Sequence, residues 1–346
     1  MIKHILVLLF AFQSAFAASP EKLAELLKKF PDADTNGDAV LTEEEALAYR
    51  AARKVGTDRA GKKSTRQEPT HADVSYGDDE KNRFDLWVPE KEESDPRNFP
   101  VLVYFHGGGF VGGDKSQFDP GSYLDAGIAC ASVNYRLVDG DTVTSPTPMI
   151  DSARALQTIR HHALEWGLDP GRIALSGGSA GAVIALWLGY HNDLADPEAE
   201  DPIARESTRV TALIPLNAPT NLMPDWIVKN IGGGKDVHGS FPKLFGEPVT
   251  HPLNGSLKAK VAEISPWEFV SEDDPPTYLV YSGPLDETPL PGTATTGKVI
   301  HHPAFGKALK EKLDTLGIEN EFRYGFDPRG KPNLAEYLMT QFGMLE

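Results

Sequence analysis

The sequence predicts an α/β fold in which helices cover both faces of a mostly parallel sheet. From residue 71 onward, apolar strand-like runs alternate with helical patterns, which is typical of a doubly wound sheet. Residues 101–105 are apolar without interruption, as expected of a strand that is buried on both faces. The chain has 346 residues, of which 40% are hydrophobic, so one sizeable core is expected.

The predicted elements follow one another along the second part of the chain. An antiparallel pair of strands is expected to lead the sheet, at residues 74–76 and 83–88. The remaining strands are predicted at residues 101–105, 128–134, 172–176, 211–216, 277–282 and 319–324, with helices at 151–166, 180–190 and 304–316. Residues 217–266 are rich in Gly and Pro and predict a cap inserted between two strands.

The N-terminus resembles a signal peptide more than a structural element. Lys3 gives a positive start, residues 5–12 are apolar, and Ala15-Phe16-Ala17 fits a small-x-small cleavage site. A buried N-terminal helix is the alternative, and it is less favoured because all three signal regions occur in order. The apolar run is too short to span a bilayer. We therefore expect residues 1–17 to be removed and the protein to be secreted or periplasmic, with no membrane span.

Residues 18–54 predict a small acidic helix-loop-helix module. The loop resembles an EF-hand calcium loop, since it repeats acidic and amide side chains at alternate positions and ends on a carboxylate. A hard cation such as calcium needs such a ring of oxygen ligands. The expected ligands are Asp34, Asn36, Asp38, the Val40 carbonyl and Glu45.

One position departs from this calcium-loop pattern. Ala39 stands where the sharp turn favours Gly, and a second register that begins at Asp32 puts Gly37 there instead. A capped helix-turn-helix without metal is the alternative interpretation. Any calcium is expected to be structural. Residues 55–70 lack apolar periodicity and predict a linker to the domain at residues 71–346.

A predicted strand runs directly into Gly-Gly-Ser-Ala-Gly at residues 177–181, and a predicted helix follows. This is the context that a Gly-x-Ser-x-Gly nucleophile elbow requires, and it makes Ser179 the candidate nucleophile. The glycines allow the turn and helix to pass close to neighbouring backbone. The amide of Ala180 at the helix N-terminus is a candidate oxyanion donor.

A second glycine-rich turn, His-Gly-Gly-Gly at residues 106–109, follows the strand at 101–105. Its unobstructed backbone N–H groups suit a developing oxyanion. This turn is therefore a candidate for the second half of the oxyanion site, opposite the amide of Ala180.

Together the two glycine motifs resemble those of the hormone-sensitive-lipase-like and bacterial feruloyl-esterase-like carboxylesterases. Further matches to these families are Gly112-Gly113-Asp114-Lys115, Asn134-Tyr135-Arg136-Leu137, Asp151 and Asp169-Pro170-Gly171-Arg172-Ile173. The resemblance covers about residues 71 to 326 and implies an α/β-hydrolase fold, with Ser179 as nucleophile and the amides of Gly108, Gly109 and Ala180 as the oxyanion hole. It also implies that His106 shapes the loop and is not the base.

The acid of a Ser-His-Asp triad has a candidate after the strand at 277–282. Asp286 follows Tyr281-Ser282-Gly283 in a turn that resembles the family's strand-Gly-x-x-Asp. Glu287 is adjacent and stays an alternative for the acid. The alternative without a catalytic role is a solvated acidic turn.

The base is where the chain departs from the family pattern. The family places its histidine after the last strand, but no histidine occurs after His302. Residues 287–300 are long enough to fold back over the pocket, which makes His301 or His302 the candidate base, and His302 is preferred. Histidines elsewhere are less favoured, because nothing in the sequence directs them to Ser179.

These features predict a secreted serine carboxylesterase that uses an acyl-enzyme and no catalytic cofactor. Its substrate would be a small-molecule or polysaccharide-linked ester. The alternative is a hydrolase-fold binding protein that has lost its base. A net charge of −16 argues against nucleic acid as a partner. Cys130, the one cysteine, lies in an apolar run and is expected to be a buried thiol.

Overall fold

The computed structural model describes residues 27, 40–42, 67–90, 98–234, 238–249, 252–325 and 333–345. It divides the chain into two units, Met1–Arg66 and Gln67–Glu346. In the first unit Leu41 is buried and Val40 is exposed. The signal peptide at 1–17 and the other expected calcium ligands, which are Asp34, Asn36, Asp38 and Glu45, lie outside the described residues. Both features therefore stay predictions.

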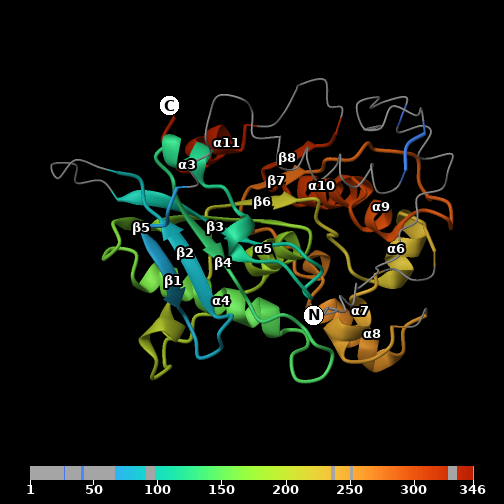
Figure 1. The fold of residues 1–346 in the computed structure, drawn as a ribbon, viewed down its shortest axis with the longest axis horizontal. Coiled ribbons are helices and arrows are strands. Elements are labelled where there is room, and N and C mark those ends of the chain that lie inside the picture. The colour runs from blue at the N-terminus through green and yellow to red at the C-terminus, as the bar shows by residue number, and fades with distance from the viewer. Residues whose placement is uncertain are drawn as a thin grey trace, which may run out of the picture. The chain divides into compact units, whose positions relative to one another are not determined.

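The second unit is built on an eight-stranded sheet with the order β1-β2-β4-β3-β5-β6-β7-β8 (Figure 1). The strands are β1 His71–Ser75, β2 Arg83–Trp87, β3 Phe99–Phe105, β4 Ala129–Val133, β5 Leu168–Gly178, β6 Ala212–Leu216, β7 Thr277–Val280 and β8 Asn320–Arg323. β2 runs antiparallel to both β1 and β4, and the other neighbours are parallel. The predicted α/β fold with a leading antiparallel pair is confirmed.

Alternate side chains of each strand point to opposite faces of the sheet. Because the central strands are apolar throughout, both faces are covered by helices. Val103 packs in one core with helices α4 Thr147–His161, α5 Ala180–Tyr190 and α10 Ala304–Leu316. Leu102 packs in a second core with α3 Gly121–Asp125 and α11 Leu334–Gln341. Cys130 is a buried free thiol in this second core, as expected.

Two helices begin and end where the sequence predicts. α5 spans residues 180–190 and α10 spans residues 304–316, where Gly317 ends the helix in the left-handed conformation. α4 instead begins at Thr147, before the predicted residue 151, because Pro148 fits the first turn of a helix.

The segment between β6 and β7 forms a cap of three helices, α6 Pro224–Asn230, α7 Phe241–Phe245 and α8 Gly255–Glu263. These helices gather at one end of the sheet with α9 Thr296–Ile300 (Figure 1). Three short 3-10 helices complete the unit, η2 Lys115–Gln117, η3 Pro202–Arg205 and η4 Pro266–Glu268. Within the described residues, no helix combines the length and the apolar character needed to cross a membrane.

Candidate active site

Ser179 occupies the sharp turn between β5 and α5, as the elbow motif predicts. Its φ of 53° and ψ of −112° lie outside the regions that residues with a side chain normally adopt. The turn is held by a hydrogen bond from the Ser179 amide to the Leu216 carbonyl at 2.9 Å. A β-carbon added at Gly181 would lie 2.0 Å from the Phe105 carbonyl oxygen, so only glycine lets α5 start this close to β3. The strained turn directs Ser179 to the carboxyl end of the sheet.

The glycine-rich turn after β3 lies beside the elbow. Gly108 and Gly109 both have positive φ, at 118° and 62°. Within the described part of the chain, the amides of Gly108, Gly109 and Ala180 donate to no protein acceptor. Ser179 and the amide-bearing Gly108 line one groove, and Ser179, Gly109 and Ala180 line an adjoining pocket. Three free donors therefore surround the candidate nucleophile.

His106 is built into this turn. Its Nδ1 donates to the Gly107 carbonyl at 2.8 Å, and its ring stacks on Tyr135 with centroids 4.3 Å apart. The His106 carbonyl accepts a hydrogen bond from the Tyr135 hydroxyl at 2.7 Å. Burial lowers the pKa of His106 below its ordinary value. The residue holds the loop, as the family resemblance implies.

The segment that follows the glycine turn is fixed by charged groups. Lys115 Nζ lies 2.6 Å from the Asp85 carboxylate on β2, and both side chains are largely buried. The Lys115 amide donates to Asn134 Oδ1 at 2.6 Å, and Asn134 Nδ2 donates to Asp114 at 3.0 Å. Burial alone would raise the pKa of Asp114, but hydrogen bonds from Ser116 and Asn134 outweigh it and lower this pKa to about 2. These matched motif residues support the loop and do not contact Ser179.

The same supporting role falls to Arg136 and Asp151. The Asp151 carboxylate accepts hydrogen bonds from the Arg136 amide at 3.0 Å and from its guanidinium at 2.9 and 2.6 Å. The Asp151 side chain is 5% exposed and that of Arg136 is 37% exposed, so the two-pronged pair holds a buried carboxylate against a partly solvated guanidinium. It joins the chain after β4 to α4.

His301 is the histidine that reaches Ser179. Its Nε2 lies 2.8 Å from the Ser179 Oγ. His301 directly follows α9, in the segment between β7 and α10 that was expected to fold back over the pocket. Burial lowers its pKa, so the ring is neutral at pH 7 and Nε2 can accept the serine proton.

His302, the preferred candidate for the base, does not contact Ser179. Its Nδ1 accepts a hydrogen bond from the Ala304 amide at 3.1 Å, at the start of α10. The side chain is buried, and its Nε2 has no hydrogen-bond partner among the residues that the structure describes. The preference for His302 is corrected to His301, because His302 turns inward to the start of the helix.

Asp286 does not hold the base either. Its carboxylate pairs with Lys298 Nζ at 2.7 Å, and this hydrogen bond lowers the pKa of Asp286. Its electrostatic influence falls on His302, and burial is the only cause of the lowered His301 pKa. Among the described residues, no hydrogen bond joins His301 to a carboxylate, that of the alternative Glu287 included. The expected Ser-His-Asp order is thus only partly assembled, as a Ser179–His301 pair.

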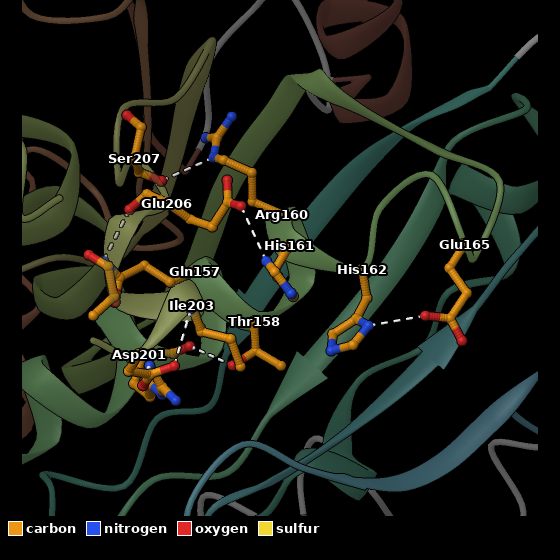
Figure 2. Close-up of polar contacts among 12 residues, drawn as sticks. Gln157, Thr158, Arg160, His161, His162, Glu165, Asp201, Ile203, Glu206 and Ser207 are labelled. Carbon is orange, nitrogen blue, oxygen red and sulfur yellow. Dashed lines mark hydrogen bonds and ion pairs between the residues drawn. The ribbon is translucent and has the colours of Figure 1, made fainter. Parts of the chain in front are cut away.

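The other histidines on helices lie apart from this pair. His161 and His162, at the end of α4, contact Glu206 at 3.1 Å and Glu165 at 2.9 Å (Figure 2). His191 stacks against Trp187 beyond the end of α5. These contacts are structural, in agreement with the sequence analysis.

Two cavities meet at Ser179. A narrow one has a volume of about 20 Å³, which is room for roughly one water-sized group. Apolar side chains from the core, the cap and α9 form most of its wall: Phe110, Val183, Pro219, Leu222, Ile227, Phe241 and Ile300. A wider groove of about 410 Å³ opens on the other side, and its polar side chains are Tyr104, Gln117, Asn217 and His301.

Sequence reasoning did not assign several residues of this site: His238 was considered only as a cap histidine that could reach a pocket, and Ser240, Tyr104 and Asn217 were missed. His238 and Ser240 of the cap line the narrow cavity, and Tyr104 and Asn217 line the groove. Asn217 follows β6 with a φ of 53°, and this unusual backbone is not encoded in any local motif. Tyr104 looked like one more apolar strand residue. The cap sequence at 217–266 contains a second histidine that could reach a pocket, His251, which lies outside the described residues.

The strand order and the serine turn after β5 define the α/β-hydrolase fold. The BD-FAE family model matches residues 84–288, more than half of the chain. The chain therefore belongs to the BD-FAE family.

Curated relatives are esterases by name. The probable carboxylic ester hydrolase LipM of Mycobacterium tuberculosis is 33% identical over 216 residues, which are 60% of this chain and 46% of LipM. Esterase LipQ of the same organism is 27% identical over 214 residues, 61% of this chain and 48% of LipQ. The chain thus spans about half the length of these relatives.

Solved structures share the fold at lower identity. A truncated carbohydrate esterase from gut microbiota has a TM-score of 0.61 and 17% identity, covering 82% of this chain and 99% of that one. Esterase Est2 of Thermogutta terrifontis has a TM-score of 0.53 and 21% identity, covering 78% of this chain and 89% of that one. At these identities the likeness concerns the fold alone.

Proposed function

We propose that this protein is a serine hydrolase of carboxylic esters. The 2.8 Å contact between His301 Nε2 and Ser179 Oγ carries the proposal, because it joins a nucleophile to a base. Membership of the BD-FAE family and the esterase names of the curated relatives support it.

The reaction proceeds through an acyl-enzyme. His301 Nε2 takes the Ser179 proton as Oγ bonds to the ester carbonyl carbon, and the carbonyl electron pair moves to oxygen. The amides of Gly108, Gly109 and Ala180 stabilise this oxyanion. As it collapses, the bond to the alkoxy oxygen breaks and that oxygen takes the proton from His301. Water then repeats the sequence on the acyl-serine and releases the acid.

The two cavities suggest how an ester is oriented. The narrow apolar cavity of about 20 Å³ suits a short acyl group such as acetyl. The open groove of about 410 Å³ suits a larger polar alcohol, such as a sugar of a polysaccharide. A carbohydrate esterase among the structures of the same fold supports this substrate class.

Two further parts of the proposal depend on sequence patterns. The protein is exported after residues 1–17 are removed. Residues 34–45 hold a structural calcium ion, which takes no part in the chemistry.

The alternative of a non-catalytic binding protein was based on the missing histidine after the last strand. The contact of His301 with Ser179 argues against that alternative.

The test measures hydrolysis of p-nitrophenyl acetate and of a peracetylated sugar by the parent chain and by Ser179→Ala. We expect the variant to lose at least roughly 1,000-fold in kcat, as for removal of a serine nucleophile. A parent no faster than the variant on either ester would refute the proposal.

A further inference from the structure

A second histidine, His238, lies beside Ser179 on the cap side of the narrow cavity. It lines that cavity together with Ser179 and Ser240. A β-carbon added at Gly109 would lie 3.0 Å from His238 Cε1 and 3.3 Å from Ser240 Oγ. The cap therefore packs closely against the oxyanion loop at this point, and a side chain at position 109 would crowd the ring.

Ser240 fixes the tautomer of this ring. The Ser240 amide donates to His238 Nδ1 at 3.2 Å, and Ser240 Oγ lies 2.5 Å from the same nitrogen. Because an amide N–H can only donate, Nδ1 is unprotonated and the neutral ring carries its proton on Nε2. Burial first, and then the nearby His301, lowers the pKa of His238, so the ring is neutral at pH 7.

The Nε2–H group has no protein acceptor within the part of the chain that the structure describes. The side chains around it are mostly apolar. This N–H group therefore remains available in the cavity, where a substrate oxygen could accept a hydrogen bond from it. Cε1, the ring atom bonded to Nε2, is the atom that contacts the Gly109 loop, so Nε2 lies near the candidate oxyanion hole.

We propose that His238 Nε2–H is a further hydrogen-bond donor to the ester carbonyl oxygen, supplied by the cap beside the amides of Gly108, Gly109 and Ala180. This inference rests on the proposed esterase function. It makes His238 a catalytic residue that contacts the reacting oxygen, and it makes Ser240 a positioning residue that orients the ring.

The geometry favours this role over that of a second base. His301 already holds the Ser179 hydroxyl, and His238 has Nδ1 occupied and Nε2 protonated, so its neutral ring offers no free acceptor. A donor is what a developing oxyanion requires. The cap then contributes directly to catalysis in addition to closing the acyl pocket.

Three variants test the donor. His238→Leu removes it, His238→Gln keeps an N–H group near the position of Nε2, and Ser240→Ala removes the hydroxyl contact to Nδ1 while leaving the backbone amide that donates to it. The measurements are kcat and KM for p-nitrophenyl acetate and the inhibition constant of methylboronic acid, which forms a tetrahedral adduct with a serine nucleophile. Ser179→Ala is measured in the same series.

For His238→Leu we expect kcat to fall about 10- to 100-fold with KM changed less than about threefold. Methylboronic acid should bind more weakly by a similar factor, because it presents the same oxygen. His238→Gln should stay within about fivefold of the parent, and Ser240→Ala should fall between the two.

Unchanged kcat in His238→Leu, or a raised KM with unchanged inhibition by methylboronic acid, would overturn the donor role. If His238→Leu does not fold, the other two variants decide the question: a fully active Ser240→Ala together with a folded His238→Gln that loses about tenfold or more in kcat overturns the role. A parent no faster than Ser179→Ala would refute the esterase function itself, which is a separate result.

Discussion

His301 Nε2 lies 2.8 Å from Ser179 Oγ, although the two residues are 122 positions apart in the chain. The histidine reaches the serine from the end of α9, ahead of α10 and β8. The candidate base therefore lies in an earlier connection than the family pattern implies, whereas the candidate nucleophile lies at the turn between β5 and α5 that the elbow motif predicts.

The activity should persist to slightly acidic pH. Burial lowers the pKa of His301 below the ordinary histidine value of 6.5, so the ring stays neutral as the pH falls to that value. We expect kcat/KM for an uncharged ester to be level at pH 7 and to fall about tenfold per pH unit only below the lowered pKa. An acidic limb with a midpoint above 6.5 in a pH-rate profile would contradict this.

Acyl length should govern the rate. A cavity of about 20 Å³ has little room beyond a methyl group, so we expect kcat/KM for p-nitrophenyl acetate to exceed that for the octanoate by at least about 100-fold. Ile227→Ala enlarges the cavity and should reduce this ratio. Ile159→Ala, buried in α4 away from the cavity, is the matched control and should leave the ratio unchanged. Equal ratios in both variants would contradict the assignment of the acyl pocket.

Replacing Asp286 should cost little activity. Its carboxylate pairs with Lys298 at 2.7 Å, and no hydrogen bond joins it to His301. We expect Asp286→Asn to lower kcat by less than about tenfold, against the roughly 10,000-fold loss seen when a triad aspartate is replaced. Lys298→Met is the control for the ion pair. A loss of about 10,000-fold in kcat for Asp286→Asn, but not for Lys298→Met, would show that the carboxylate orients the base.

Calcium should bind the N-terminal unit. The ligand pattern at residues 34–45 predicts one ion, and saturation at 100 times the dissociation constant would stabilise that unit by about 2.7 kcal/mol. Calorimetric titration of the purified chain should detect this binding in the parent and in Glu21→Gln, outside the loop, but not in Asp38→Ala. Binding that is absent from the parent, or the same in all three proteins, would contradict the site.

The fold was predictable because its signals are local. Uninterrupted apolar runs marked the buried strands, and Gly317 marked the end of α10. The elbow and the glycine turn were predictable for the same reason, since the residues that shape Ser179 and Gly109 stand beside them in the chain. The antiparallel pairing of β1 with β2 was also predicted from two neighbouring strand-like runs, whereas the pairing of β2 with β4 was not.

The base and the cap residues were not predictable in this way. Their positions depend on how residues 287–300 and the cap pack against the sheet, which is a tertiary effect without a local motif. His302 was preferred over its neighbour, but its Nδ1 accepts the Ala304 amide and its ring is turned inward. The orientation of the His238 ring depends on the hydrogen bond that its Nδ1 accepts from Ser240, two residues further along the chain.

The most direct test of the account compares His301→Ala, His302→Ala and Ser179→Ala in hydrolysis of p-nitrophenyl acetate. We expect His301→Ala to lower kcat by at least about 1,000-fold, close to the loss in Ser179→Ala, because the two residues act as a unit. His302→Ala should keep kcat within about tenfold of the parent, provided that its melting curve shows a folded protein. Full activity in His301→Ala, or a loss confined to His302→Ala, would contradict the assignment of His301 as the base of Ser179.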